Sequence, residues 1–200
     1  MKLFLILPII VALSACAPRD SREVLPAQPD WFAAHVNDAA RFAEIFAVSE
    51  DNPFIFATQE QILSMLRYGT GVIAFGFPAC PHCHNAFPIL ERAFKEMHMH
   101  HYAGARGRIL YYDIFDDRAQ NTEFYQILIG YLKDYLMNDA EGNPRIFVPD
   151  VYFLVSGTIV GNHLGTVPGI TNPREPVGAE QEAELRQIYK NLIEKIACDC

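Results

Sequence analysis

The chain has 200 residues, half of them hydrophobic and a fifth charged, which is the composition of a globular protein with room for one domain and short extensions. Its formal net charge is −8. This charge argues against a nucleic-acid partner, because nucleic acids are bound mainly through basic patches that displace counterions from phosphates.

The first fifteen residues have the pattern of a targeting segment. Lys2 is followed by an apolar run that is too short for an ordinary membrane-spanning helix, which is typical of a signal peptide. The run closes with the motif LSAC, ending at Cys16, which resembles the lipobox of bacterial lipoproteins. That resemblance implies a signal peptide over residues 1–15, lipid attachment at Cys16 and a membrane-anchored, extracytoplasmic lipoprotein of the bacterial cell envelope. A plain secretory signal with an incidental Cys16 is the alternative.

Export determines how the other cysteines are interpreted, because disulfides form and persist in oxidising compartments. Apart from Cys16, the cysteines form two close pairs, Cys80 with Cys83 and Cys198 with Cys200. Structural disulfides of a small scaffold are usually spread along the chain. These pairs therefore favour redox chemistry or metal binding over structural cross-linking.

In chain order, residues 16–30 are polar and rich in proline, which predicts a tether. Apolar residues at helical spacing predict an added N-terminal helix within residues 31–50, from Trp31 to Val48, with Asp30 as its N-cap. A short strand is expected over residues 54–57. Thr58 is expected to cap a helix that reaches Tyr68.

The segment over residues 72–77 is continuously apolar, which predicts a central strand covered on both faces. A helix is expected from about Cys80 to Met97, kinked near Pro88. A strand over residues 108–114 follows. A helix is then expected over residues 120–137, with its buried stripe formed by Phe124, Ile127, Leu128, Tyr131, Leu132 and Tyr135.

Residues 141–144 carry a turn signal, and the two runs at 151–155 and 158–162 predict a β-hairpin. A loop rich in proline and glycine is expected over residues 164–178. The last helix is expected over residues 179–197, with an inward face formed by Leu185, Ile188, Leu192, Ile193 and Ile196. The aromatic residues Phe75, Phe77, Tyr111 and Tyr112 are expected in the core.

The order of these elements resembles the thioredoxin fold, an α/β fold whose central mixed sheet is flanked by helices, here with an added N-terminal helix. The spacing of Cys80, Cys83 and Pro88 is similar to the thioredoxin active-site helix. The dipeptide Val148-Pro149 resembles the family's cis-proline entry to the next strand, and the CPHC motif is similar to that of DsbA-type proteins. The resemblance covers residues 54–197 and leaves 198–200 as a cysteine-containing tail.

This resemblance implies a thiol–disulfide oxidoreductase that needs no bound cofactor and acts on protein thiols or disulfides in the envelope, with a redox partner protein. A cysteine at a helix N-terminus faces free N–H groups that favour its thiolate, so Cys80 is the expected nucleophile and Cys83 the resolving thiol. A protonated His82 would stabilise that thiolate further. Pro149, if cis, would leave room for a substrate backbone.

The sequence departs from the thioredoxin family and from DsbA-type enzymes in two features. The family usually places a buried carboxylate six residues before the first cysteine, and this sequence has Ala74 there. Residues 116–137 leave room for only about one helix, so the large helical insertion of DsbA-type enzymes is absent. The chain is also similar to lipid-anchored thioredoxin-like proteins of bacterial envelopes, including bacteriocin-transport accessory-type proteins.

Several alternatives stay open. Cys80 and Cys83 could form half of a zinc site with Cys198 and Cys200 as the second half. The cluster Met97-His98-Met99-His100-His101 could bind copper, with His98 and His101 on one helical face, in a metal- or partner-binding module for metalloprotein assembly. A solvated helix end is the alternative for that cluster. The closely spaced pair Cys198-Cys200 could relay electrons or could be incidental.

Overall fold

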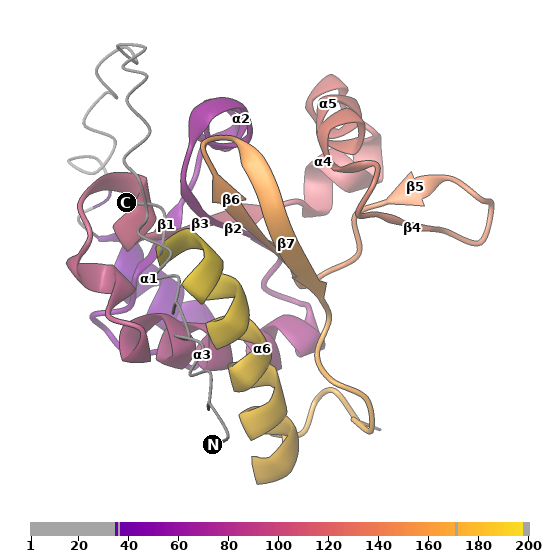
Figure 1. Cartoon of the computed structure of the whole chain (residues 1–200). Helices are drawn as coiled ribbons and strands as arrows, with labels where there is room; N and C mark the ends of the chain where they lie inside the picture. The colour runs from indigo at the N-terminus through magenta and orange to yellow at the C-terminus, as the bar shows by residue number, and fades with distance from the viewer. Residues whose placement is uncertain (1–34, 36, 171, 198–200) are drawn as a thin grey trace, which may run out of the picture. The chain divides into compact units, whose positions relative to one another are not determined.

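The computed structural model of this protein describes residues 35, 37–170 and 172–197. Five strands form one mixed sheet in the order β1-β3-β2-β6-β7 (Figure 1). Strands β1 (Phe54–Phe56), β3 (Ile109–Asp113) and β2 (Gly71–Gly76) run parallel to one another. Strands β6 (Asp150–Val155) and β7 (Thr158–Leu164) are each antiparallel to the preceding neighbour. The expected α/β class with a mixed central sheet is confirmed.

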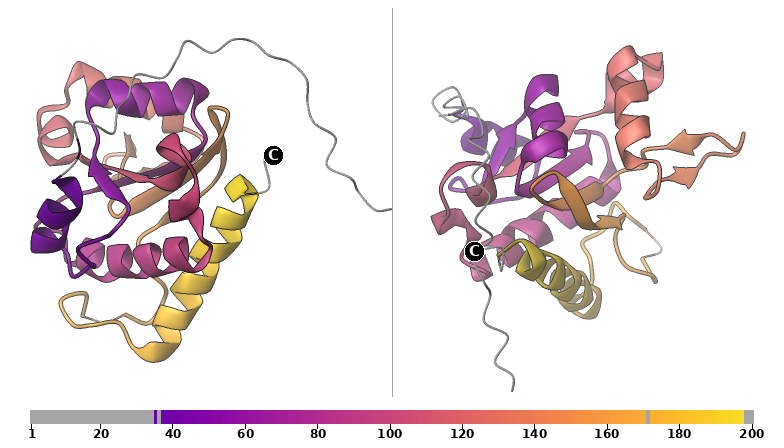
Figure 2. Two further views of the ribbon diagram at one scale, coloured as in Figure 1. Left: turned by 90° about the vertical axis from the view of Figure 1, so that its left-hand side faces the viewer. Right: turned by 45° about the horizontal axis from the view of Figure 1, so that its top comes forward.

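Helices cover both faces of this sheet, as the two views in Figure 2 show. One face packs against α1 (Asp38–Ile45), α3 (Pro81–Glu96) and α6 (Ala179–Ala197). The other face packs against α2 (Gln59–Tyr68) and α5 (Glu123–Leu132). Strand β2 lies between these layers and is buried along its whole length, which explains its continuously apolar sequence.

Local signals placed several elements correctly. Thr58 and Gln61 form a reciprocal capping box that begins α2, and α6 has the expected bounds. The predicted hairpin is β6–β7, with Ser156 and Gly157 at positive φ in its turn. Helix α3 continues through Pro88 to Glu96. The inward face of α6 also includes Tyr189, which is fully buried and was not predicted.

The predicted helix over residues 120–137 is wrong in its bounds and in its buried face. A short helix α4 (Phe115–Gln120) precedes α5, and the two are separated by Asn121 in the left-handed conformation. Helix α5 ends at Leu132, and a small hairpin of β4 (Met137–Asn138) and β5 (Pro144–Arg145) follows. The buried residues of α5 are Phe124, Tyr125, Leu128 and Leu132, whereas Ile127, Tyr131 and Tyr135 are exposed.

The N-terminal helix is confirmed, but α1 ends at Ile45, before the predicted end at Val48. The predicted start and its Asp30 cap lie outside the described residues. Helix α1 packs through aromatic contacts: the Phe42 ring stacks on that of Phe54 with centroids 4.0 Å apart. Two short 3-10 turns, Met99–His101 and Gly104–Gly107, connect α3 to β3. Within the described part of the chain, no helix combines the length and apolar character needed to cross a membrane.

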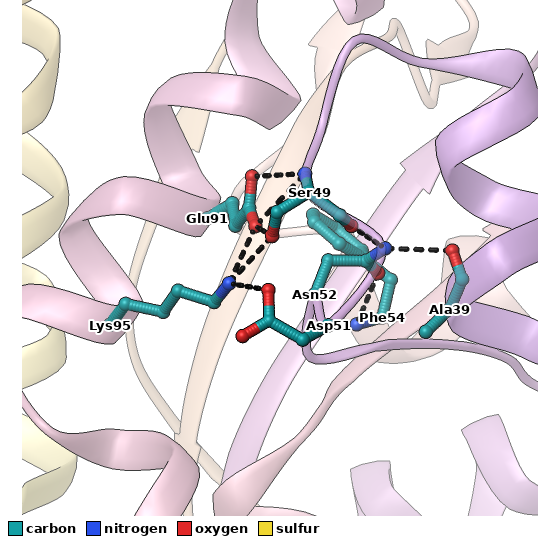
Figure 3. Close-up of polar contacts among 7 residues, drawn as sticks. All are labelled: Ala39, Ser49, Asp51, Asn52, Phe54, Glu91 and Lys95. Carbon is teal, nitrogen blue, oxygen red and sulfur yellow. Dashed lines mark hydrogen bonds and ion pairs between the residues drawn. The ribbon is translucent and has the colours of Figure 1, made fainter.

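A polar cluster fastens the segment after α1 to α3 (Figure 3). The buried carboxylate of Glu91 accepts hydrogen bonds from the backbone N–H of Ser49, at 3.2 Å to each oxygen, and from the Ser49 hydroxyl. Lys95 Nζ lies 3.0 Å from Glu91 Oε1 and 2.6 Å from Asp51 Oδ1. Nearby, Asn52 Nδ2 donates to the Ala39 carbonyl at 2.7 Å. One buried carboxylate therefore joins the N-terminal extension to α3.

Replacing Glu91 by alanine is expected to lower the free energy of unfolding by about 2 kcal/mol, because the Ser49 N–H and hydroxyl and the Lys95 ammonium each lose an acceptor. Urea unfolding at pH 7, followed by far-UV circular dichroism, measures this change. Glu96→Ala is the matched control on the same helix, since among the described residues its carboxylate pairs with the partly exposed Arg186 and Lys190. The control is expected to lose less than about 1 kcal/mol. Equal losses in both variants would contradict the role assigned to Glu91.

Candidate functional site

The two cysteines of the CPHC motif lie where β2 passes into α3. The chain leaves β2 after Gly76, and Cys80 is the N-cap residue of α3, with Pro81 as the first helical residue. Cys80 Sγ accepts a hydrogen bond from the backbone N–H of Cys83 at 3.1 Å. The sulfur thus occupies the place that a serine or aspartate oxygen takes in an ordinary helix cap. This position also exposes it to the positive end of the helix dipole.

Cys80 and Cys83 form a disulfide, with their Cα atoms 5.3 Å apart. Both residues are buried: Cys80 keeps 3% of its surface exposed and Cys83 none. Cys80 is therefore the more exposed residue of the pair. A reacting partner would reach Cys80 before Cys83.

Pro149 lies beside this disulfide, although nearly seventy residues separate them in the sequence. The Val148–Pro149 peptide bond is cis, as expected. Cys80 Sγ lies 3.8 Å from the Val148 carbonyl oxygen. The backbone N–H of Gly165, at the end of β7, donates to the Pro149 carbonyl at 2.7 Å. The residues just before β6 thus contact the N-terminus of α3 through Val148 and the segment after β7 through Pro149.

Gly76 was not singled out by the sequence, yet the site requires it. A Cβ atom at this position would lie 2.7 Å from Phe87 Cζ and 3.2 Å from Cys83 Sγ. These distances are shorter than ordinary van der Waals contacts. A glycine at the end of β2 therefore lets Cys83 approach the sheet. Ala74, two residues earlier, is fully buried in an apolar cluster, so no carboxylate occupies that position.

The histidine of the motif and the one directly after it have different surroundings. His82 is partly buried, and its Nδ1 atom is buried without a hydrogen-bond partner among the described residues. His84 Nε2 lies 2.7 Å from the Pro78 carbonyl oxygen, and its ring packs 5.0 Å from the Phe46 ring. His84 therefore stabilises the turn before Cys80 through its contact with the Pro78 carbonyl. Its position in the sequence, directly after the motif, was the available signal for a residue close to the site.

The loop over residues 164–178 reaches the same end of α3. Asn85 Nδ2 donates to the carbonyl oxygens of Pro173 at 2.9 Å and Glu175 at 3.1 Å. A hollow of about 250 Å³ lies between this loop and the motif, lined in part by Pro78, Pro81 and Arg174. These contacts place the loop beside the first turns of the helix that carries Cys83.

A buried carboxyl group also follows Pro149 directly, and the sequence did not indicate it. Asp150 is 1% exposed, and its carboxyl accepts hydrogen bonds from Tyr152 Oη at 2.6 Å and Asn162 Nδ2 at 3.1 Å. Burial raises the pKa of Asp150 to about 7, and these two hydrogen bonds only partly oppose the rise. Asp150 lies opposite Phe75 of β2 in the strand register. The sheet therefore contains one acid that ionises near neutral pH.

The histidine cluster lies beyond the end of α3. Helix α3 ends at Glu96, so His98 and His101 belong to a 3-10 turn and not to that helix, but their rings stack with centroids 5.9 Å apart. The rings of His100 and His101 lie 4.0 Å apart, and burial, followed by the neighbouring histidines, lowers the pKa of His100. Among the described residues, no three His, Cys, Asp or Glu side chains are grouped so that they could hold a metal ion.

Phe77 also differs from its prediction. Phe75 and Tyr111 are fully buried, as expected of core residues, and Tyr112 is partly buried. Phe77 is only partly buried, and its ring packs 5.3 Å from that of Phe115, which is half exposed. Cys16, Cys198 and Cys200 lie outside the described residues. The lipid attachment, the second half of a zinc site and the electron relay therefore stay predictions.

The sequence matches no protein-family model and no curated protein sequence. The chemistry of the site is therefore inferred from its own geometry: a disulfide at a helix N-terminus, next to a cis-proline and beneath a proline-rich loop.

Proposed function

We propose that this chain has a thioredoxin fold and is a thiol–disulfide oxidoreductase that exchanges disulfides with envelope proteins through Cys80 and Cys83. The observation that carries the proposal is the Cys80–Cys83 disulfide at the N-terminus of α3, within 3.8 Å of the Val148 carbonyl. The sheet order and the helices on both of its faces are compatible with this fold.

In the oxidising direction, a client thiolate attacks Cys80 Sγ, and the electron pair of the broken S–S bond leaves on Cys83 as a thiolate. A second client thiolate then attacks the client sulfur of the mixed disulfide and releases Cys80 as a thiolate. The client loses two electrons and gains a disulfide, and the Cys80–Cys83 pair gains two electrons. In the reducing direction, the Cys80 thiolate attacks a client disulfide and Cys83 resolves the intermediate.

Local groups support Cys80 as the reacting sulfur. The Cys83 N–H points at Cys80 Sγ, and the helix dipole stabilises negative charge there, so both favour the Cys80 thiolate as a leaving group and as a nucleophile. Pro149 has no N–H of its own, and a client backbone can lie beside it without meeting an unpaired donor. The reduction potentials of the partner proteins set the net direction.

For the location, we propose a lipoprotein anchored through Cys16 in the bacterial cell envelope, with residues 16–30 as the tether. The support is the LSAC motif directly after the apolar run. Metabolic labelling with a fatty-acid analogue tests this proposal, since Cys16→Ser is expected to abolish the label. An equally labelled variant would contradict it.

The function is tested by trapping. A Cys83→Ser variant keeps the attacking sulfur and lacks the resolving one, so it is expected to accumulate mixed disulfides between Cys80 and client proteins in cells. These adducts should disappear on reduction, and they should be absent from the Cys80→Ser, Cys83→Ser double variant. A Cys83→Ser protein that is produced and folded but forms no adduct would overturn the proposal.

A further inference from the structure

A second hollow lies away from the dithiol, between α4–α5 and the β4–β5 hairpin, which are neighbours in Figures 1 and 2. Its volume is about 480 Å³. Two arginines, Arg118 from α4 and Arg145 from β5, line it together with polar side chains, which include Asn121, Gln126, Asp139 and Asn143. The protein as a whole is acidic, so a gathering of cations in one hollow is a local feature of this surface.

The two guanidinium groups are close enough to repel each other. Burial, followed by the charge of Arg145, lowers the pKa of Arg118. Arg118 Nη1 donates to the Ile146 carbonyl at 3.2 Å, which satisfies one of its five donors. In the described part of the chain, no carboxylate lies within ion-pair distance of either arginine. The guanidinium groups of Arg118 and Arg145 thus lie in a partly desolvated hollow, and no carboxylate of the described residues pairs with them directly.

The single carboxylate that lines this hollow is engaged elsewhere. Asp139 Oδ1 accepts the backbone N–H groups of Glu141 at 3.1 Å and Asn143 at 2.8 Å, which form the turn of the β4–β5 hairpin. The charged groups of the lining therefore sum to one positive charge. Guanidinium groups bind carboxylates through paired hydrogen bonds, so the hollow is suited to an oxyanion.

Both arginines also pack on the two segments that form the dithiol site. The Arg118 guanidinium lies 5.2 Å from the centroid of the Phe77 ring, three residues before Cys80. The Arg145 guanidinium lies 5.9 Å from the centroid of the Phe147 ring, two residues before Pro149. The half-exposed Phe115 packs on Phe77 in the same region. Each arginine of the hollow therefore contacts an aromatic ring that is two or three residues from Pro149 or Cys80 in the chain.

We propose that the hollow lined by Arg118 and Arg145 binds a carboxylate side chain of the client polypeptide and positions that client for exchange at Cys80. This inference rests on the proposed function and adds its substrate class: clients with an acidic residue near the reacting cysteine. The arginines are positioning and specificity residues, because they touch the client without touching the exchanging sulfurs.

The test compares two dithiol peptides that differ only in flanking residues, one with glutamates and one with glutamines. The measurement is the rate constant for reduction of the Cys80–Cys83 disulfide in the purified protein, by quenched alkylation. The glutamate peptide is expected to react about tenfold faster, as one charged hydrogen-bonded pair allows. Arg118→Gln and Arg145→Gln should each remove most of that advantage. Arg186→Gln, on α6 and paired with Glu96, is the matched control and should keep it.

Dithiothreitol, which has no carboxylate, separates this proposal from the proposed function. Equal dithiothreitol rates in all variants, together with loss of glutamate preference in the two arginine variants, support the proposal. A glutamate preference that is absent from the unmodified protein, or that survives in Arg145→Gln, overturns it while leaving the function intact. Failure of dithiothreitol to reduce the unmodified disulfide overturns the function itself.

Competition by inorganic phosphate tests whether the hollow binds a free anion instead of a client carboxylate. Phosphate is expected to compete with the glutamate peptide only weakly beyond the effect of sodium chloride at the same ionic strength. Tight phosphate binding that is lost in Arg145→Gln, without any glutamate preference, would assign the hollow to a free anion and overturn the client proposal. Arg118→Gln removes a hydrogen bond to the Ile146 carbonyl and could disturb folding. Arg145→Gln keeps the proposal testable in that case, because among the described residues the Arg145 side chain makes no hydrogen bond that the substitution would break.

Discussion

Replacing Cys80 by serine is expected to reduce catalysed disulfide exchange to the rate of buffer alone. The variant lacks the sulfur that the helix N-terminus activates, and serine is not a nucleophile toward disulfides at neutral pH. The measurement is the dithiothreitol-driven reduction of a disulfide-linked test protein, with and without the purified variant. Cys83→Ser is expected to lose multiple turnover as well. In a separate reaction of the reduced variant with the test protein, without dithiothreitol, it is expected to retain one attack per molecule, seen as a mixed disulfide.

The cysteines outside the described residues supply the control for this experiment. A Cys198→Ser, Cys200→Ser variant is expected to keep the dithiol exchange of Cys80 and Cys83, because those two sulfurs suffice for the proposed chemistry. A slower rate in this variant would support the electron relay that the close spacing of the terminal cysteines leaves open. Residual catalysis in Cys80→Ser that disappears only when the terminal pair is also removed would place the reacting sulfur in the tail and contradict the proposed site.

Replacing Asp150 by asparagine is expected to stabilise the protein, and increasingly so as the pH rises. The folded protein holds the pKa of Asp150 at about 7, above its ordinary value of 3.8, mainly because the carboxyl is buried. A raised pKa means that the folded state favours the neutral acid. Its stabilising contribution is complete below pH 3.8 and is lost as the pH rises through 7. Ionisation costs about 4 kcal/mol at pH 8, from a shift of about three pKa units.

Asparagine stays neutral throughout this range. Its Oδ1 can accept the hydrogen bond from Asn162, and its Nδ2 group can donate to the Tyr152 hydroxyl, which can act as an acceptor. The free energy of unfolding of the variant, minus that of the unmodified protein, should therefore be near zero at pH 4 and reach up to about 4 kcal/mol at pH 8. Urea titrations at both pH values give this difference, and the subtraction cancels the titration of the other groups. A difference that does not grow with pH would show that Asp150 ionises near its ordinary range.

Much of the fold could be predicted because its signals are local. The capping box of Thr58 and Gln61, the Ser156-Gly157 turn and the continuously apolar β2 each require only neighbouring residues. The prediction of one helix over residues 120–137 was wrong because its local signal did not specify a buried face. Its apolar residues have helical spacing all around the axis, so periodicity alone could not select the face that packs on the sheet. The left-handed Asn121 and the early end at Leu132 further shortened and divided it.

The sequence by itself determined the disulfide pair of the candidate site, because two cysteines three residues apart at a helix N-terminus are close enough to form a disulfide. It also indicated Pro149, through the dipeptide that precedes a strand. Only the tertiary structure decided which residues from distant segments meet. Gly76, Asp150, Arg118 and Arg145 acquire their significance from contacts between segments that are distant in the sequence. Burial and the proximity of charges, which set pKa values and binding sites, are properties of the packed chain.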